Sequence, residues 1–135
     1  MHADVLVVGT GIAGLSYAVR LAKKSPDAKI IMISKRDLLE SNTKYAQGGI
    51  AVVSNFFNDS YEEHVRDTMV ASAYTSKEHV VDFVVREGPA CVKELMEWGA
   101  QFDTKGAALH LGKEGGHSTK RIVHHKDQSG LHIQN

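Results

Sequence analysis

The stretch DVLVVGTGIAGLSYAVRLAKKS, residues 4–25, decides the fold class of this 135-residue chain. Residues 4–8 form a short apolar run rich in β-branched side chains, which is typical of a strand buried on both faces of a parallel sheet. Residues 15–22 carry apolar side chains at helical spacing, and the apolar run 28–34 predicts a second strand. A strand, a helix and a strand within about thirty residues predict a βαβ unit and an α/β fold.

Three glycines between the first strand and the helix form the pattern G-x-G-x-x-G. Gly9 lets the chain turn sharply out of the strand, Gly11 lets a pyrophosphate approach the backbone, and Gly14 lets the helix pack close to the strand. The free N–H groups and the positive dipole end of the helix favour phosphate. In this context the pattern predicts a dinucleotide site. The alternative is a tight structural turn with incidental glycines.

The acidic residue that usually binds the adenosine ribose is missing. It is expected about 20 positions after the glycines, where this chain has Ser34 and Lys35. The ribose is therefore expected to be held by Ser34, by backbone groups or by Lys35. On these residues alone, NAD, NADP and FAD all remain possible cofactors.

The composition argues against several other classes of protein. The 16 basic and 16 acidic residues give a formal net charge of zero, whereas nucleic-acid-binding domains usually carry a basic excess. No apolar run approaches the ~20 residues that span a bilayer, and the N-terminus lacks the pattern of a signal peptide. Cys91 is the only cysteine, which suits a reducing compartment. We therefore expect a cytoplasmic protein that binds neither nucleic acid nor membrane.

The segment SNTKYAQGGIAVV, residues 41–53, differs from a solvated linker because it combines hydroxyl and amide side chains, a glycine pair and an apolar end. Such a stretch can lay backbone N–H groups against a ring system or a pyrophosphate. Thr43 and Gln47 would add side-chain hydrogen bonds. A polar loop with a glycine turn is the alternative interpretation.

Helices are expected in the middle of the chain. Glu63 stands three residues after Ser60, as in a capping box, and Gly99 follows the last helical pattern, as is common just beyond a helix end. Gly88 and Pro89 are expected to break the chain. The predicted helices are 60–73, 76–87 and 90–99. Beyond residue 100 we expect an irregular segment rich in glycine and histidine.

That last segment contains a group of charged side chains. Glu114 precedes two glycines, whose backbone freedom can present a carboxylate to a ligand. His117, Arg121 and His124 could bind a dicarboxylate, since arginine forms bidentate pairs with carboxylates. A surface loop with scattered charges is the alternative. No metal site is expected, because no cysteine partners the histidines and no H-x-x-x-H spacing lies on a clear helix.

Three segments together resemble one protein family. They are GTGIAGLSYAVRLA (9–22), SNTKYAQGGIA (41–51) and KEGGHSTKRIVHHKDQSG (113–130). In order and spacing they are similar to the L-aspartate oxidase branch of the succinate dehydrogenase and fumarate reductase flavoprotein superfamily, from Ala3 to Gly130. The resemblance implies that residues 1–135 are the N-terminal part of a Rossmann-like FAD-binding domain. The capping domain, the helical C-terminal domain and a catalytic arginine would lie beyond residue 135.

The resemblance also implies FAD held without a covalent bond. The fumarate reductase and succinate dehydrogenase branch carries a flavin-linking histidine before the Gln-Gly-Gly, and residues 37–49 contain no histidine. The Ser-Lys at the end of the second predicted strand is a feature of the L-aspartate oxidase branch. The implied FAD contacts are Gly9, Thr10, Gly11, Ile12, Ala13, Gly14, Ser34, Lys35, Asn42, Thr43, Lys44, Tyr45, Ala46, Gln47, Gly48 and Gly49.

The activity implied by the resemblance is oxidation of L-aspartate to iminosuccinate, the first step of NAD biosynthesis from aspartate. A hydride would pass from the substrate Cα to flavin N5, and the electrons to oxygen or fumarate. Quinolinate synthase would act downstream. Glu114 would receive the substrate's amino group, while His117, Arg121, His124 and Asp127 match the family pattern with less defined roles. The alternatives are a soluble fumarate reductase or succinate dehydrogenase flavoprotein, and a flavin-binding fragment without activity.

Overall fold

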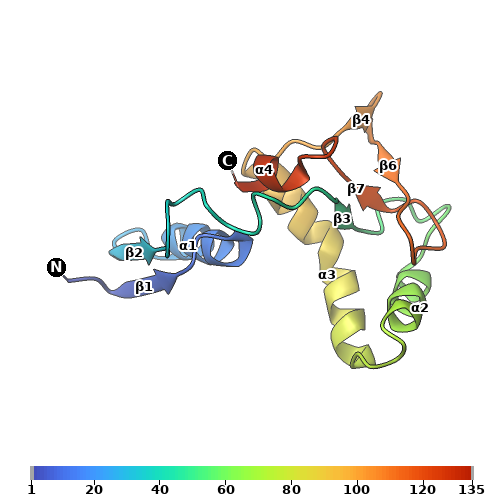
Figure 1. Cartoon of the computed structure of the whole chain (residues 1–135), viewed down its shortest axis with the longest axis horizontal. Coiled ribbons are helices and arrows are strands. Elements are labelled where there is room, and N and C mark those ends of the chain that lie inside the picture. The colour runs from blue at the N-terminus through green and yellow to red at the C-terminus, as the bar shows by residue number, and fades with distance from the viewer. Residues whose placement is uncertain (1, 135) are drawn as a thin grey trace.

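The computed structural model describes residues 2–134, and its N-terminal part is a βαβ unit (Figure 1). Strand β1 (Val5–Val8) leads into helix α1 (Ile12–Lys24), which returns the chain to strand β2 (Ile30–Ile33). The strands pair in parallel, with Val5 opposite Ile30 and Val8 opposite Ile33. The predicted α/β class with a parallel sheet is therefore confirmed.

The prediction that the first strand is buried on both faces is wrong for this chain. Val7 is 7% exposed, whereas Leu6 and Val8 are 57% and 75% exposed. Successive side chains of a strand point to opposite faces of the sheet, and α1 covers the face of Val7, where Gly14 comes close to it. Within the described residues, no element covers the opposite face of the strand. An apolar run shows that a strand can be buried on both faces, but it does not show whether a covering element is present on each of them.

Helices α2 (Tyr61–Ala71) and α3 (Glu78–Glu97) pack as a hairpin at the other end of the molecule (Figure 1). The predicted start of α2 is confirmed, since the Oγ of Ser60 accepts a hydrogen bond from the N–H of Glu63 at 3.1 Å. The side chains between the helices form a small apolar core of Val65, Met69, Val81 and Val85.

Helix α3 continues through Gly88 and Pro89, so the predicted break at these residues is wrong. A proline inside a helix removes one backbone hydrogen bond and costs about 3 kcal/mol in the absence of tertiary contacts. Here Val85 and Val92, 5% and 4% exposed, lie on the same face on either side of Gly88. Burial of that face stabilises one continuous helix. The helix ends as predicted, with Gly99 at φ +108°.

The glycine- and histidine-rich segment is more ordered than the sequence predicted. Strand β7 (Ile122–Val123) pairs antiparallel with both β3 (Ile50–Ala51) and β6 (Leu111–Gly112). The other elements of the segment are the hairpin of β4 (Thr104–Lys105) and β5 (Ala108–Leu109), and helix α4 (Ser129–Gln134). The main apolar core lies between this small sheet and α3, and consists of Val52, Val92, Phe102 and Val123.

Helix α4 contacts the glycine turn and the loop that follows β2. The side-chain N–H of Gln134 donates to the carbonyl of Thr10 at 3.4 Å, and the backbone N–H of Gly130 donates to the carbonyl of Ala46 at 3.0 Å. A Cβ on Gly130 would lie 1.8 Å from the carbonyl oxygen of Thr43, so only glycine permits this contact. Across residues 2–134, no helix combines the length and the apolar content that a bilayer crossing requires.

Candidate functional site

The structure brings the glycine turn and the 41–49 loop together, although they are far apart in the sequence. The N–H of Ile12, at the start of α1, donates to Oγ1 of Thr43 at 3.0 Å. A Cβ on Gly11 would lie 3.2 Å from the same oxygen, so the missing side chain allows the close approach. The two stretches that the sequence assigned to one cofactor therefore meet at the N-terminal end of α1.

The geometry of the turn fits a pyrophosphate-binding site. Gly9 has φ +109°, in the left-handed region that favours glycine. A Cβ on Gly14 would lie 2.1 Å from the carbonyl oxygen of Gly9, so glycine is required for α1 to begin this close to β1. Thr10 is 5% exposed, and its Oγ1 has no hydrogen-bond partner within residues 2–134. A buried hydroxyl without a protein partner fits a turn that receives a polar ligand.

The predicted cofactor contacts outside the turn lie just after β2 and in the 41–49 loop. The hydroxyl of Ser34 donates to the carbonyl of Arg36, and Lys35 is exposed. The hydroxyl of Tyr45 donates to Glu40 at 2.6 Å. Lys44 and Gly49 are partly buried. The other exposed members are Ile12 and Ala13 at the turn and Asn42, Tyr45, Ala46, Gln47 and Gly48 in the loop. The loop thus offers an open surface next to the turn.

Glu114 lies against the Gln-Gly-Gly part of the same loop. A Cβ on Gly48 would be 3.4 Å from Oε1 of Glu114, so the carboxylate faces bare backbone there. The two residues line a cavity of about 330 Å³ that also contains His124. The other lining residues are Gln47, Gly49, Gly112, Lys113, Ile122, Lys126 and Asp127. Glu114 and His124, two of the four predicted substrate-site residues, therefore share one cavity with part of the predicted cofactor loop.

Arg121 occupies a different place from the one its predicted role requires. Its side chain is 0% exposed and binds both carboxylate oxygens of Asp59, through Nε at 2.9 Å and Nη2 at 2.7 Å. Its Nη1 lies 2.7 Å from Oδ2 of Asp67 and 3.3 Å from Nδ1 of His117. The guanidinium thus already has carboxylate partners from this chain. We assign Arg121 and the neighbouring His117 to a buried polar network that supports the 114–121 loop.

Asp67 is the second anchor of that loop. Its Oδ2 also accepts the backbone N–H and the hydroxyl of Ser118, each at 2.7 Å. Burial alone would raise the pKa of Asp67, but the hydrogen bonds from Ser118 and the Arg121 guanidinium lower it to about 2. The sequence analysis missed both Asp59 and Asp67. The available signal was two polar residues three apart in α2, His64 and Asp67, beside the buried apolar stripe.

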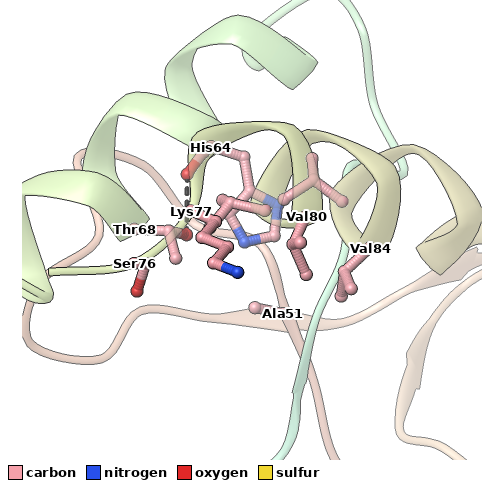
Figure 2. Close-up of a pocket in the computed structure, with 9 residues that line it drawn as sticks. Ala51, His64, Thr68, Ser76, Lys77, Val80 and Val84 are labelled. Atoms are coloured by element: carbon pink, nitrogen blue, oxygen red, sulfur yellow. Dashed lines mark hydrogen bonds between the residues drawn. The ribbon is translucent and has the colours of Figure 1, made fainter. Parts of the chain in front are cut away.

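His64 joins this network to a second cavity between α2 and α3. Figure 2 shows the side chains of His64, Lys77, Val80 and Val84, which line this cavity. Its volume is about 480 Å³. The ring of His64 packs edge-on against His117, with the centroids 5.7 Å apart. Burial, together with the positive charge of Arg121, lowers the pKa of His64 from 6.5 to about 4. His64 therefore remains neutral in the folded protein at neutral pH.

We expect this histidine to make the protein less stable in mild acid. The folded-state pKa lies below the unfolded one, so the contribution of His64 is complete above about pH 6.5 and is lost as the pH falls toward about 4. His64→Gln should reduce the loss of unfolding free energy between about pH 7 and about pH 5 by about 2 kcal/mol. Urea denaturation at the two pH values measures this. The exposed His79→Gln is the matched control, and an equal loss in wild type and His64→Gln would contradict the prediction.

Almost the whole chain matches one family model and a set of related sequences. Residues 4–134 match the family model described as FAD binding domain. The chloroplastic L-aspartate oxidase of Oryza sativa subsp. japonica is 46% identical over 132 residues, which are 97% of this chain and 20% of that protein. The L-aspartate oxidase of Yersinia pestis is 43% identical over 136 residues, which are 97% of this chain and 25% of that protein. The chain thus spans a fifth to a quarter of the length of these relatives.

Comparison with solved structures gives a consistent result. The FrdA chain of an E. coli quinol fumarate reductase variant superposes with a TM-score of 0.92 at 32% identity, over 99% of this chain and 23% of that one. The Mycobacterium smegmatis protein described as Sdh1 superposes with a TM-score of 0.89 at 30% identity, over 98% of this chain and 22% of that one. The geometry of the turn and the 41–49 loop therefore belongs to an arrangement that larger proteins share.

Proposed function

This chain belongs to the FAD binding domain family, and on that premise we propose that it forms the N-terminal part of the FAD and substrate sites of an L-aspartate oxidase. The reaction would convert L-aspartate to iminosuccinate. The sequence relatives at 46% and 43% identity carry the name L-aspartate oxidase, which supports this choice within the family.

FAD is the cofactor, and the described residues offer it a place. Its pyrophosphate would lie over the turn from Gly9 to Gly14, where three glycines lack side chains and the hydroxyl of Thr10 has no hydrogen-bond partner among residues 2–134. Residues 42–49 would flank the rest of the cofactor, and Ser34 or Lys35 would hold the ribose. We propose that the attachment is non-covalent, because the loop before Gln47 contains no histidine.

The position of Glu114 is the observation that carries the aspartate assignment. Its carboxylate lies beside the loop assigned to FAD and in the same cavity as His124. An ammonium group gains from a carboxylate partner, whereas a dicarboxylate without an amine would be repelled. The bound FAD would supply the acceptor for two electrons. Glu114 would hold the substrate's amino group and so orient its Cα–H bond toward that acceptor.

The remaining parts of the proposal concern the protein as a whole. Electrons would leave the enzyme to oxygen or to fumarate, and iminosuccinate would be consumed by quinolinate synthase. A cytoplasmic location is part of the same proposal. The L-aspartate oxidase resemblance supports each of these steps.

Glu114→Gln tests the assignment in the complete gene product. The substitution keeps the size of the side chain and removes its charge, so kcat/KM for L-aspartate should fall about 10- to 100-fold. Binding of succinate, followed by the change in flavin absorbance, should stay the same or tighten. Peroxide production from L-aspartate measures the first quantity. An equal loss for both ligands would contradict the role of Glu114.

The control and the competing function use the same assays. Glu97→Gln removes an exposed carboxylate from the end of α3 and should leave both quantities unchanged. Wild-type protein that oxidises succinate but not L-aspartate would overturn the proposed function in favour of a succinate dehydrogenase type flavoprotein. Flavin retained without turnover of either compound would indicate a binding module.

A further inference from the structure

Asp103 contacts three consecutive residues of the segment that carries His124. It lies between α3 and β4, and its Oδ2 accepts the backbone N–H of Lys126 at 2.9 Å. Its own N–H donates to the carbonyl of His124 at 2.8 Å. Nδ1 of His124 lies 3.3 Å from Oδ2, and Nδ1 of His125 lies 3.5 Å from Oδ1. One side chain therefore holds a whole turn.

The hydrogen bond to Asp103 holds a turn with an unusual backbone conformation. Lys126 has φ +47°, a left-handed conformation that a residue other than glycine rarely adopts. The hydrogen bond from the N–H of Lys126, with the nearby His125 and His124, lowers the pKa of Asp103. The group is thus an ionised carboxylate at neutral pH. A negative charge is therefore held next to Nδ1 of His124.

The other side of the His124 ring faces the cavity of Glu114. With Nδ1 next to Asp103, the second ring nitrogen, Nε2, lies on the side of Gly112. A Cβ on Gly112 would lie 3.4 Å from Cδ2 and 3.7 Å from Nε2, so this edge of the ring meets the bare backbone of the cavity wall. His110 packs edge-on against the ring, with the centroids 5.2 Å apart. The ring is thus positioned by a neighbouring ring and by a carboxylate.

We propose that Asp103 is a positioning residue that sets His124 to bind a carboxylate of the substrate. Nδ1 lies on the side of Asp103, so when the ring carries both protons the one on Nε2 is donated to the substrate. The cavity then offers a hydrogen-bond donor at His124 and a carboxylate at Glu114, which match the carboxylate and the ammonium group of an α-amino acid. Lys113, Lys126 and Asp127 line the same cavity and contribute to its field. The inference rests on the proposed function and names the group that recognises the second charge of the substrate.

Asp103→Asn in the complete gene product distinguishes the effect of Asp103 on His124 from its structural role in holding the turn at Lys126. The amide oxygen can still accept the N–H of Lys126, but the negative charge next to His124 is gone. We expect KM for L-aspartate to rise about tenfold with a smaller change in kcat. His124→Gln should give a similar rise, and Asp103→Asn should add nothing in the His124→Gln background. Asp27→Asn, in the exposed connection after α1, is the control.

Different results would contradict the positioning role of Asp103 and the proposed function. Additive losses in the double variant, or a loss of bound flavin in Asp103→Asn that accounts for the whole change, would overturn the positioning role. In ¹⁵N-histidine-labelled protein, the Nδ1 signal that His124→Gln removes should shift in Asp103→Asn, and an unchanged signal would overturn the contact itself. Wild-type protein without aspartate oxidation would overturn the proposed function, whereas the ¹⁵N signal reports on Asp103 and His124 in either case.

Discussion

Arg121→Met should lower the free energy of unfolding by about 3–5 kcal/mol, because it leaves two buried carboxylates without their cation. The side chains of Asp59 and Asp67 are only 4% and 10% exposed. Both point at the same guanidinium, which is 0% exposed. Without it, two negative charges would face each other out of water, or one would have to be protonated. Urea denaturation of the complete gene product at neutral pH measures the effect.

Two further variants test whether the loss of stability comes from the buried charges. Arg66→Met removes an arginine of α2 whose side chain is 64% exposed and pairs with the neighbouring Glu63 at 3.8 Å, so it should cost well under about 1 kcal/mol. Replacing Arg121, Asp59 and Asp67 together by neutral residues should restore part of the lost stability, because no buried charge remains. Equal effects of Arg121→Met and Arg66→Met would show that the network contributes nothing to stability.

Gly14→Ala should abolish tight flavin binding and destabilise the fold by about 3 kcal/mol or more. The new Cβ would lie 2.1 Å from the carbonyl oxygen of Gly9 and 3.4 Å from the side chain of Val7. Backbone atoms cannot move away as the end of a side chain can, so α1 would have to shift from β1. That shift would displace the turn on which the pyrophosphate is proposed to lie. The flavin absorbance that remains after gel filtration, together with urea denaturation, measures both effects.

Gly88→Ala is the matched control, since Gly88 is also inside a helix. Its Cβ would lie 3.5 Å from Val52, an ordinary contact. The higher helix propensity of alanine should make this variant neutral or up to about 1 kcal/mol more stable. Flavin retained by Gly14→Ala at the level of Gly88→Ala would contradict the assigned role of the turn.

Local patterns predicted the elements well where short-range physics determines them. The order strand, glycine turn, helix and strand follows from side-chain periodicity and from three glycines, and it is confirmed over residues 5–33. The start of α2 depends on one hydroxyl and one N–H three residues apart, and it is also confirmed. The predicted break at Pro89 failed because burial on both sides of it outweighs the local cost, and burial depends on residues distant in the sequence.

The site shows the same division. The sequence indicated the turn and the 41–49 loop separately, and only the fold shows that Thr43 meets Ile12 across the start of α1. Residue types alone made Arg121 a candidate for binding a substrate carboxylate. The structure gives it two carboxylates of its own, Asp59 and Asp67, because charged groups this deeply buried require partners.

The sequence by itself determined the βαβ unit, the glycine turn and the carboxylate of Glu114 before two glycines, since each depends on residues within a few positions of one another. Only the tertiary structure decided which charges face a ligand. Glu114 and His124 line one cavity, whereas the side chain of Arg121 is buried in the interior. Asp103 accepts a hydrogen bond from the backbone N–H of Lys126. The physical reason is that the cost of burying a charge, and the partners that offset this cost, depend on contacts between segments far apart in the chain.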